Sequence, residues 1–152
     1  MKHFIIDGNN LIGKIKNIKK LQNKDRQTAR EKLAYLIENY FQGKKVKVSL
    51  HFDGFQNSVI RIHGVKIIYS EDKTADEKIK TEISASKNPR NVIVITSDNN
   101  IKEFARVCSA SVILSEEFSA ELKKRKEINE EERKIRSIDN VEEFKKIFNV
   151  KK

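Results

Sequence analysis

Three aspartates each follow a short apolar segment that has the composition of a buried strand. Asp7 follows residues 3–6, Asp53 follows residues 46–52, and Asp98 lies just beyond residues 92–96. The carboxyl ends of parallel strands share one edge of a sheet, and ligands bind there at the point where the strand order reverses. Carboxylates that meet at such an edge repel one another unless a cation compensates them, and hard oxygen ligands suit Mg²⁺ or Mn²⁺. The spacing therefore predicts an acidic site that is suited to a divalent metal.

Asp76 is a fourth acid that can reach the same edge. Thr74 and Glu77 fit a capping box, which places Asp76 in the first turn of a helix expected over residues 74–86. If the strand before it is parallel to the others, that helix begins where the strands end.

Each of these acids also has an ordinary structural interpretation. Asp98 fits the N-cap of the helix that follows Ser97, Asp76 fits an interaction with its helix dipole, and Asp53 with Gly54 fits a turn. On spacing alone, the metal site and the structural roles are equally open.

The sequence lacks the residues that other common site chemistries require. There is no phosphate-binding loop of the G-x-x-x-x-G-K-[ST] or G-x-G-x-x-G type. The three histidines (His3, His51 and His63) lie in strand-like segments without a paired ligand motif. Ser97 and Ser115 have no matching histidine and acid. A single cysteine, Cys108, excludes an internal disulfide and argues against a cysteine zinc site.

Strand-like and helical patterns alternate along the chain, which predicts an α/β sheet. Besides the three strands above, we expect strands at residues 65–69 and 112–114 and helices at residues 25–41, 74–86 and 101–108. A further helix opens at Ser115, and its charges match the helix dipole. Residues 127–137 are nearly all polar. A capping box at Asp139 and Glu142 predicts a final short helix, whose inward residues would be Val141, Phe144 and Phe148.

The chain of 152 residues carries a formal charge of +10. Such a surplus favours a polyanionic partner, because each neutralised phosphate releases counterions, although a generic lysine-rich surface gives the same balance. No apolar run approaches the length of a membrane span, and no signal peptide is visible. We therefore expect a cytoplasmic protein without a membrane partner; the oligomeric state stays open.

Four segments in order resemble the NYN branch of the PIN-like nucleases and are most similar to its YacP-like group. They are Ile-Ile-Asp-Gly-Asn-Asn-Leu-Ile at residues 5–12, His-Phe-Asp-Gly at 51–54, Thr-Ala-Asp-Glu-Lys-Ile at 74–79 and Val-Ile-Thr-Ser-Asp at 94–98. The resemblance covers roughly residues 3–120. It implies a doubly wound, mostly parallel five-stranded sheet of order 3-2-1-4-5 with helices on both faces. We expect a nuclease domain over residues 1–126, with the polar segment and C-terminal helix at 127–152 packing on it.

The resemblance also implies a metal-dependent endoribonuclease that uses Mg²⁺ or Mn²⁺ to hydrolyse RNA phosphodiester bonds. Asp7, Asp76 and Asp98 match the catalytic and metal-binding acids. Asp53 matches an acid whose role is open, as a further metal ligand. Many relatives have the motif D-G-Y-N at the first acid, and here Asn9 replaces the tyrosine of the polar pair. The expected substrate contacts are Asn9, Asn10, Thr96, Ser97, Lys14, Lys16, Arg26 and Arg30.

YacP-like proteins include ribosome-associated messenger-RNA endonucleases, which makes the ribosome a candidate partner beside RNA. The basic run after Asp7 fits the RNA backbone and fits a solvated face equally well. The alternatives are a catalytically inactive RNA-binding or adaptor domain of the same fold, a toxin-type PIN ribonuclease, and a phosphoacceptor receiver domain. A receiver domain requires an acidic pair after the first strand, where this chain has a lone Asp7.

Overall fold

Five strands form one parallel sheet in this computed structural model, which describes the backbone of residues 1–150 and the side chains of residues 1–135. The strands are β1 (Lys2–Asp7), β2 (Val46–Phe52), β3 (Lys66–Tyr69), β4 (Val92–Ile95) and β5 (Ser111–Ile113). Their order is β3-β2-β1-β4-β5, and each neighbouring pair is parallel. The predicted fold class and strand order are confirmed.

The register aligns the strand ends on either side of β1. Asp7 pairs with His51 of β2, and Ile6 pairs with Ile95 of β4. The chain adds β2 and β3 on one side of β1 before it returns to add β4 on the other. The strand order therefore reverses between β1 and β4, where ligands bind in open α/β sheets.

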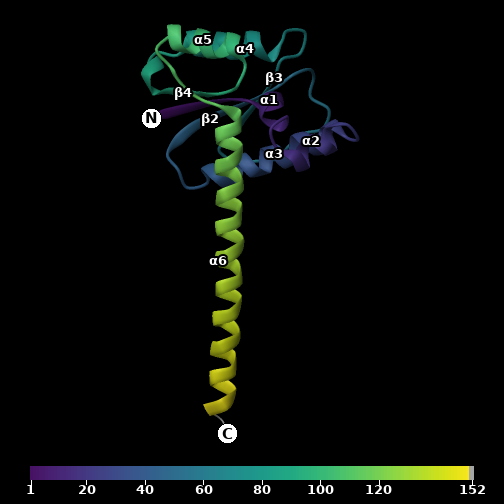
Figure 1. Cartoon of the computed structure of the whole chain (residues 1–152), viewed down its shortest axis with the longest axis vertical. Coiled ribbons are helices and arrows are strands. Elements are labelled where there is room, and N and C mark those ends of the chain that lie inside the picture. The colour runs from purple at the N-terminus through teal and green to yellow at the C-terminus, as the bar shows by residue number, and fades with distance from the viewer. Residues whose placement is uncertain (151–152) are drawn as a thin grey trace. The chain divides into compact units, whose positions relative to one another are not determined.

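Helices cover both faces of the sheet (Figure 1). One face carries α1 (Gly8–Ile12), α2 (Lys16–Gln22) and α3 (Arg26–Phe41), and the other carries α4 (Ala75–Ala85) and α5 (Asn99–Val107). A short 3₁₀ turn, η1 (Pro89–Asn91), precedes β4. The predicted capping box of α4 is present, with Thr74 and Glu77 each bonding to the other's backbone N–H. Neither α1 nor α2 is among the predicted elements.

Apolar side chains of β1 alternate between the two faces, as a parallel sheet that is buried on both sides requires. Ile5 joins the cluster beneath α4 and α5, which includes Ile79, Val94 and Ile101. Phe4 contacts Phe41 of α3, with ring centroids 4.8 Å apart. Two separate cores thus fix β1, and with it the position of Asp7.

A buried polar cluster joins α4 to the sheet. Ser49 and His51 of β2 are almost fully buried, and both bond to Glu82 of α4, at 2.7 and 2.9 Å. Nε2 of His3 lies 2.9 Å from Oγ of Ser49. His3 and His51 therefore attach a helix to the sheet.

Residues 53–65 connect β2 to β3 without a helix. The segment runs along α3, which holds it by hydrogen bonds at three places. Gln27 donates to the carbonyl of Ser58, Arg30 donates to the carbonyls of Asp53 and Phe55, and Glu38 accepts from the backbone N–H of His63. This contact explains how two adjacent parallel strands are joined with no crossover helix of their own.

The last helix, α6, spans Ser115–Val150. The chain divides into two compact units, Met1–Ser119 and the remainder. The backbone beyond Asp139 belongs to α6 and forms no separate helix. The structure does not describe the side chains predicted to cap that helix (Asp139 and Glu142) or to point inward from it (Val141, Phe144 and Phe148). The expected boundary at residue 126 and the packing of residues 127–152 stay predictions. None of the helices in the described part is long and apolar enough to span a lipid bilayer.

Candidate active site at the carboxyl edge of the sheet

Asp7 ends the central strand and is only 7% exposed. Burial raises its pKa to about 6, against the opposing effect of hydrogen bonds from Thr96 and the backbone of Asn10. The negative charges of Asp53 and Asp98 raise it further. Asp7 is thus a desolvated acid that faces two other acids.

Gly8 allows α1 to begin directly against β2. A Cβ at this position would overlap the carbonyl oxygen of His51 and would lie 2.8 Å from the ring of Phe52. The glycine that follows Asp7 is therefore required by close packing, and it lets the chain turn away from the acid at once.

Thr96 links the first and last acids. Its hydroxyl donates to Oδ2 of Asp7 at 2.9 Å and accepts from the backbone N–H of Asp98 at 3.1 Å. Asp98 also caps α5, because its Oδ1 accepts from the backbone N–H of Ile101. The structural role considered for Asp98 is therefore real, and it accounts for one of the two carboxylate oxygens.

Asp53 fastens three elements together. Its Oδ1 accepts from the backbone N–H of Ala75 at the start of α4, and its own N–H donates to Oδ1 of Asn9, both at 2.8 Å. Asp76 is the next residue of α4, and its Oδ1 pairs with Lys80 at 2.9 Å. Asp76 lies at the predicted edge, with one oxygen engaged by its own helix.

Asn9 and Asn10 form hydrogen bonds that hold neighbouring loops in place. Oδ1 of Asn9 holds the backbone of Asp53, while Oδ1 of Asn10 accepts from the backbone N–H of Ser97 and from the hydroxyl of Ser115. Asn9 and Asn10 were expected to contact substrate. The structure shows that their carbonyl oxygens tie the loops around Asp7 to one another.

Glu116 was not predicted as part of this edge. It lies in the first turn of α6, where Oε2 accepts from Ser97 at 3.0 Å and Oε1 pairs with Lys14 at 3.0 Å. Its position just beyond β5 was visible in the sequence, but the residue was assigned to the helix dipole. Lys14, expected at the RNA backbone, is an ion-pair partner of this acid.

Arg30 requires a correction. It was expected to contact RNA, but it is 3% exposed, and its guanidinium donates to the carbonyls of Asp53 and Phe55. The same group lies over the rings of Phe52 and Tyr69, at 5.5 and 5.2 Å. A guanidinium enclosed in this way is not available to a phosphate. The exposed Lys16 and Arg26 keep their predicted role as an expectation.

The acids at this edge suit a divalent cation in charge and in donor type. Asp7, Asp53 and Asp98 supply hard carboxylate oxygens, and a cation would relieve the repulsion that raises the pKa of Asp7. Within the described residues, no three acidic, histidine or cysteine side chains are grouped closely enough to enclose an ion. Mg²⁺ does not need such a cage, because it usually keeps several of its waters.

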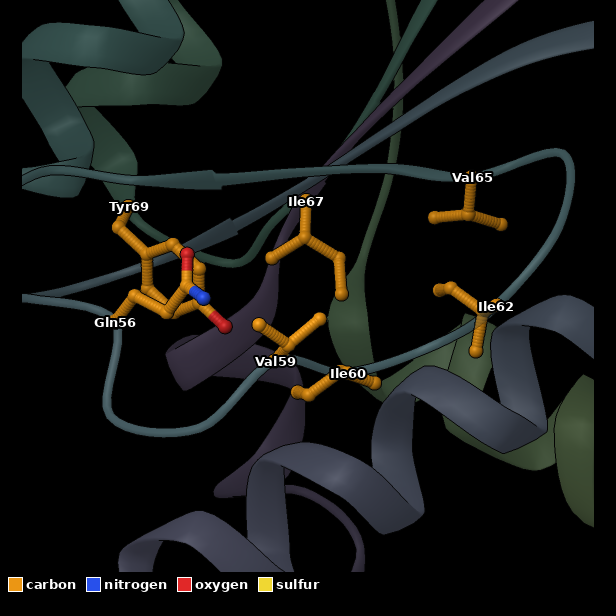
Figure 2. A pocket seen from close by; sticks show the side chains of 7 residues that line it. All are labelled: Gln56, Val59, Ile60, Ile62, Val65, Ile67 and Tyr69. Carbon is orange, nitrogen blue, oxygen red and sulfur yellow. The ribbon is translucent and has the colours of Figure 1, made fainter.

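A pocket lies beside β3 (Figure 2), and none of these acids lines it. It is formed by the segment after Phe55 and by the strand itself. Its lining residues are Gln56, Val59, Ile60, Ile62, Val65, Ile67 and Tyr69.

A parallel 3-2-1-4-5 sheet with acids at its switch point defines the class of PIN-like nuclease domains to which the NYN domains belong. The chain belongs to the YacP-like NYN domain family, whose model matches residues 4–151. This is a family of nuclease-type domains with RNA-related function, so the expected family is confirmed.

Two crystal structures share the fold. That of Rae1 (YacP) from Bacillus subtilis has a TM-score of 0.74 at 25% identity, and the match covers 93% of this chain and 85% of that one. The W164L mutant of the same protein also has a TM-score of 0.74, at 28% identity, with 90% and 85% covered. A comparison with curated protein sequences gives no match.

Proposed function

We propose that this chain is a divalent-metal-dependent endoribonuclease that hydrolyses phosphodiester bonds of RNA. The observation that carries the proposal is the buried Asp7 at the switch point, with a pKa of about 6 and two further acids near it. Membership of a nuclease-type family supports the reaction class.

The proposed metal ligands are Asp7, Asp76 and Asp98, joined by Asp53. When bound, Mg²⁺ or Mn²⁺ lowers the pKa of a water and neutralises charge that develops on the phosphate. Thr96 orients the carboxylate of Asp7 and fixes the backbone of Asp98. Asp76 contributes once it exchanges Lys80 for the cation.

The loops around the acids are held by neutral side chains. Asn9 and Asn10 fix the segments that carry Asp53 and Ser97, which limits how far the acids can move apart. The exposed Lys16 and Arg26 attract the RNA backbone, a contact that adds affinity without reading sequence.

The test compares cleavage of structured and unstructured RNA with Mn²⁺ by the wild type, Asp7→Asn and Asp98→Asn. We expect both variants to lose at least 100-fold in rate, roughly the loss that follows removal of one stabilising group at a reaction centre. Asp25→Asn is the matched control, because asparagine also caps a helix and Asp25 only caps α3. Equal cleavage by all four proteins would refute the site, and RNA binding without cleavage by the wild type would favour an inactive adaptor domain.

Messenger RNA on the ribosome is the proposed substrate, and cytoplasm the proposed place of action. The YacP-like resemblance and the charge of +10 support this choice. Sedimentation with ribosomes at low and high salt measures it: the chain is expected in the ribosome fraction at low salt. A chain that stays at the top of the gradient under both conditions contradicts a ribosomal partner.

A further inference from the structure

The pocket beside β3 has two chemically different parts. Five of the seven residues that line it are aliphatic, while Gln56 and Tyr69 lie together at one end (Figure 2). The cavity is about 220 Å³. No acidic residue lines it.

Arg30 contacts both this pocket and the proposed active site. Arg30 donates to the carbonyl of Asp53 and to that of Phe55, the residue just before Gln56. The same guanidinium lies 5.2 Å from the ring centre of Tyr69. One buried side chain therefore fixes both the acid after β2 and the polar end of the pocket.

The surface beside the pocket is unusually apolar for an exposed loop. Phe55 is 58% exposed and Val59 is 66% exposed. The exposed Arg61 and Lys66 lie between or next to lining residues in the sequence. Aromatic side chains next to basic ones are features of surfaces that bind single-stranded nucleic acid.

We infer that this pocket binds the base of one nucleotide of the RNA substrate. The inference rests on the proposed RNA cleavage. A nucleobase has apolar faces that suit the aliphatic wall, and polar edges that suit an amide and a phenol, each of which can donate and accept. The cavity is smaller than the roughly 300–1,000 Å³ of sites for drug-sized ligands, as a site for a single ring system should be.

The first experiment measures binding of a fluorescein-labelled single-stranded RNA to full-length Asp7→Asn protein, which is expected to bind without cutting. Val59→Asp added to this background places a carboxylate at the pocket. We expect it to weaken binding about 5- to 150-fold, the range that corresponds to loss of one stacked base. The matched control is Val107→Asp, because Val107 is 84% exposed on α5 and does not line the pocket.

The second experiment uses RNAs in which one nucleotide at a time is abasic. One position should weaken binding to Asp7→Asn by a similar factor and should have no further effect once Val59→Asp is present. If Val59→Asp lowers the melting temperature, Val59→Ala replaces it in both experiments. We expect Val59→Ala to cause a smaller loss of RNA affinity.

Three outcomes overturn the inference. Equal RNA affinity of the Val59 and Val107 variants, or an abasic effect that is undiminished by Val59→Asp, excludes a base in the pocket. A change of oligomeric state in Val59→Asp, seen by sedimentation, assigns the pocket to contact between copies. Cleavage that still depends on Asp7 in these cases leaves the proposed function intact, whereas a wild type that binds RNA without cutting refutes the function alone.

Discussion

Asp7 is held in an environment that disfavours its charge. Its pKa is raised from 3.8 to about 6, chiefly by burial. For a carboxyl group whose pKa is higher in the folded state, the contribution to stability is complete below the unfolded pKa and is lost as pH rises through the folded one. At neutral pH the metal-free protein therefore carries an electrostatic penalty at this residue.

Asp7→Asn should relieve that penalty. In a chelator at pH 7.5 we expect the variant to have a free energy of unfolding about 2 kcal/mol above that of the wild type. The difference should shrink between pH 6 and pH 4, as Asp7 becomes protonated in the wild type. Urea unfolding at several pH values measures it. Added Mg²⁺ should stabilise only the wild type, and a variant less stable than the wild type at pH 7.5 contradicts the raised pKa.

Glu82 shows the opposite behaviour. Its burial acts to raise its pKa, but hydrogen bonds from His51 and Ser49 outweigh burial and lower it. A carboxylate with a lowered pKa contributes stability that is present above the unfolded value and lost as pH falls through the folded one. Glu82 should therefore stabilise the attachment of α4 at neutral pH.

Glu82→Gln should reduce the free energy of unfolding at pH 7 by about 1–3 kcal/mol, because a buried hydrogen-bonded charge is replaced. The gap to the wild type should begin to close only below the ordinary glutamate pKa of 4.5, and it should be lost as pH falls through the lowered pKa of Glu82. Glu103→Gln, at an exposed position on α5, is the control and should change stability little. A gap that stays unchanged well below pH 4.5 would rule out the ionised form of Glu82 as its cause.

The sequence predicted the positions of the acids at this edge better than the contacts of their neighbours. Asp7, Asp53 and Asp98 follow strands, and parallel strands end at one edge, so their meeting followed from the pattern. The partners of Arg30 and Glu116 depend on which loop passes beside them, and local sequence does not encode that contact. Arg30 was therefore assigned to RNA, and Glu116 was overlooked.

Among the helices, α3, α4 and α5 were predicted, whereas the short α1 and α2 were not. Residues 25–41 have a helical apolar stripe, and β2 was predicted at its observed bounds. The five residues of α1 start with a glycine and two asparagines, which are poor helix formers. This helix exists because Leu11 and Ile12 are buried and because the asparagines bond to distant loops.

Gly8→Ala tests the close approach of α1 to β2. The added methyl group would overlap the backbone of β2, which cannot withdraw without disturbing the sheet. We expect a loss of about 1–3 kcal/mol in the free energy of unfolding, as for other overpacked positions, together with reduced RNA cleavage. Gly43→Ala is a useful comparison: no atom lies within 4 Å of its Cβ, although its φ of +79° adds strain. Equal activity of Gly8→Ala and the wild type contradicts this packing account.

At the scale of the whole molecule, the charge of +10 makes RNA affinity a function of salt. For single strands the logarithm of the binding constant falls with the logarithm of salt concentration by about 0.7 for each phosphate neutralised. Replacement of both Lys16 and Arg26 by glutamine should reduce this slope by about 1.4. The same change at the exposed Lys123 and Lys124 is the control. Fluorescence anisotropy over a salt series gives both slopes, and equal slopes refute the placement of RNA along α2 and α3.

The hydrogen bonds of Asn10 can form only late in synthesis of the chain. Its partners, Ser97 and Ser115, follow it by 87 and 105 residues. During synthesis the N-terminal strand leaves the ribosome first, yet the loops beside its acid are secured only after the start of α6 has emerged. Contacts between residues so distant in the chain also slow folding, because a long loop must close before they can form. The edge that carries Asp7 is therefore translated early and is completed only after Ser115 has joined the chain.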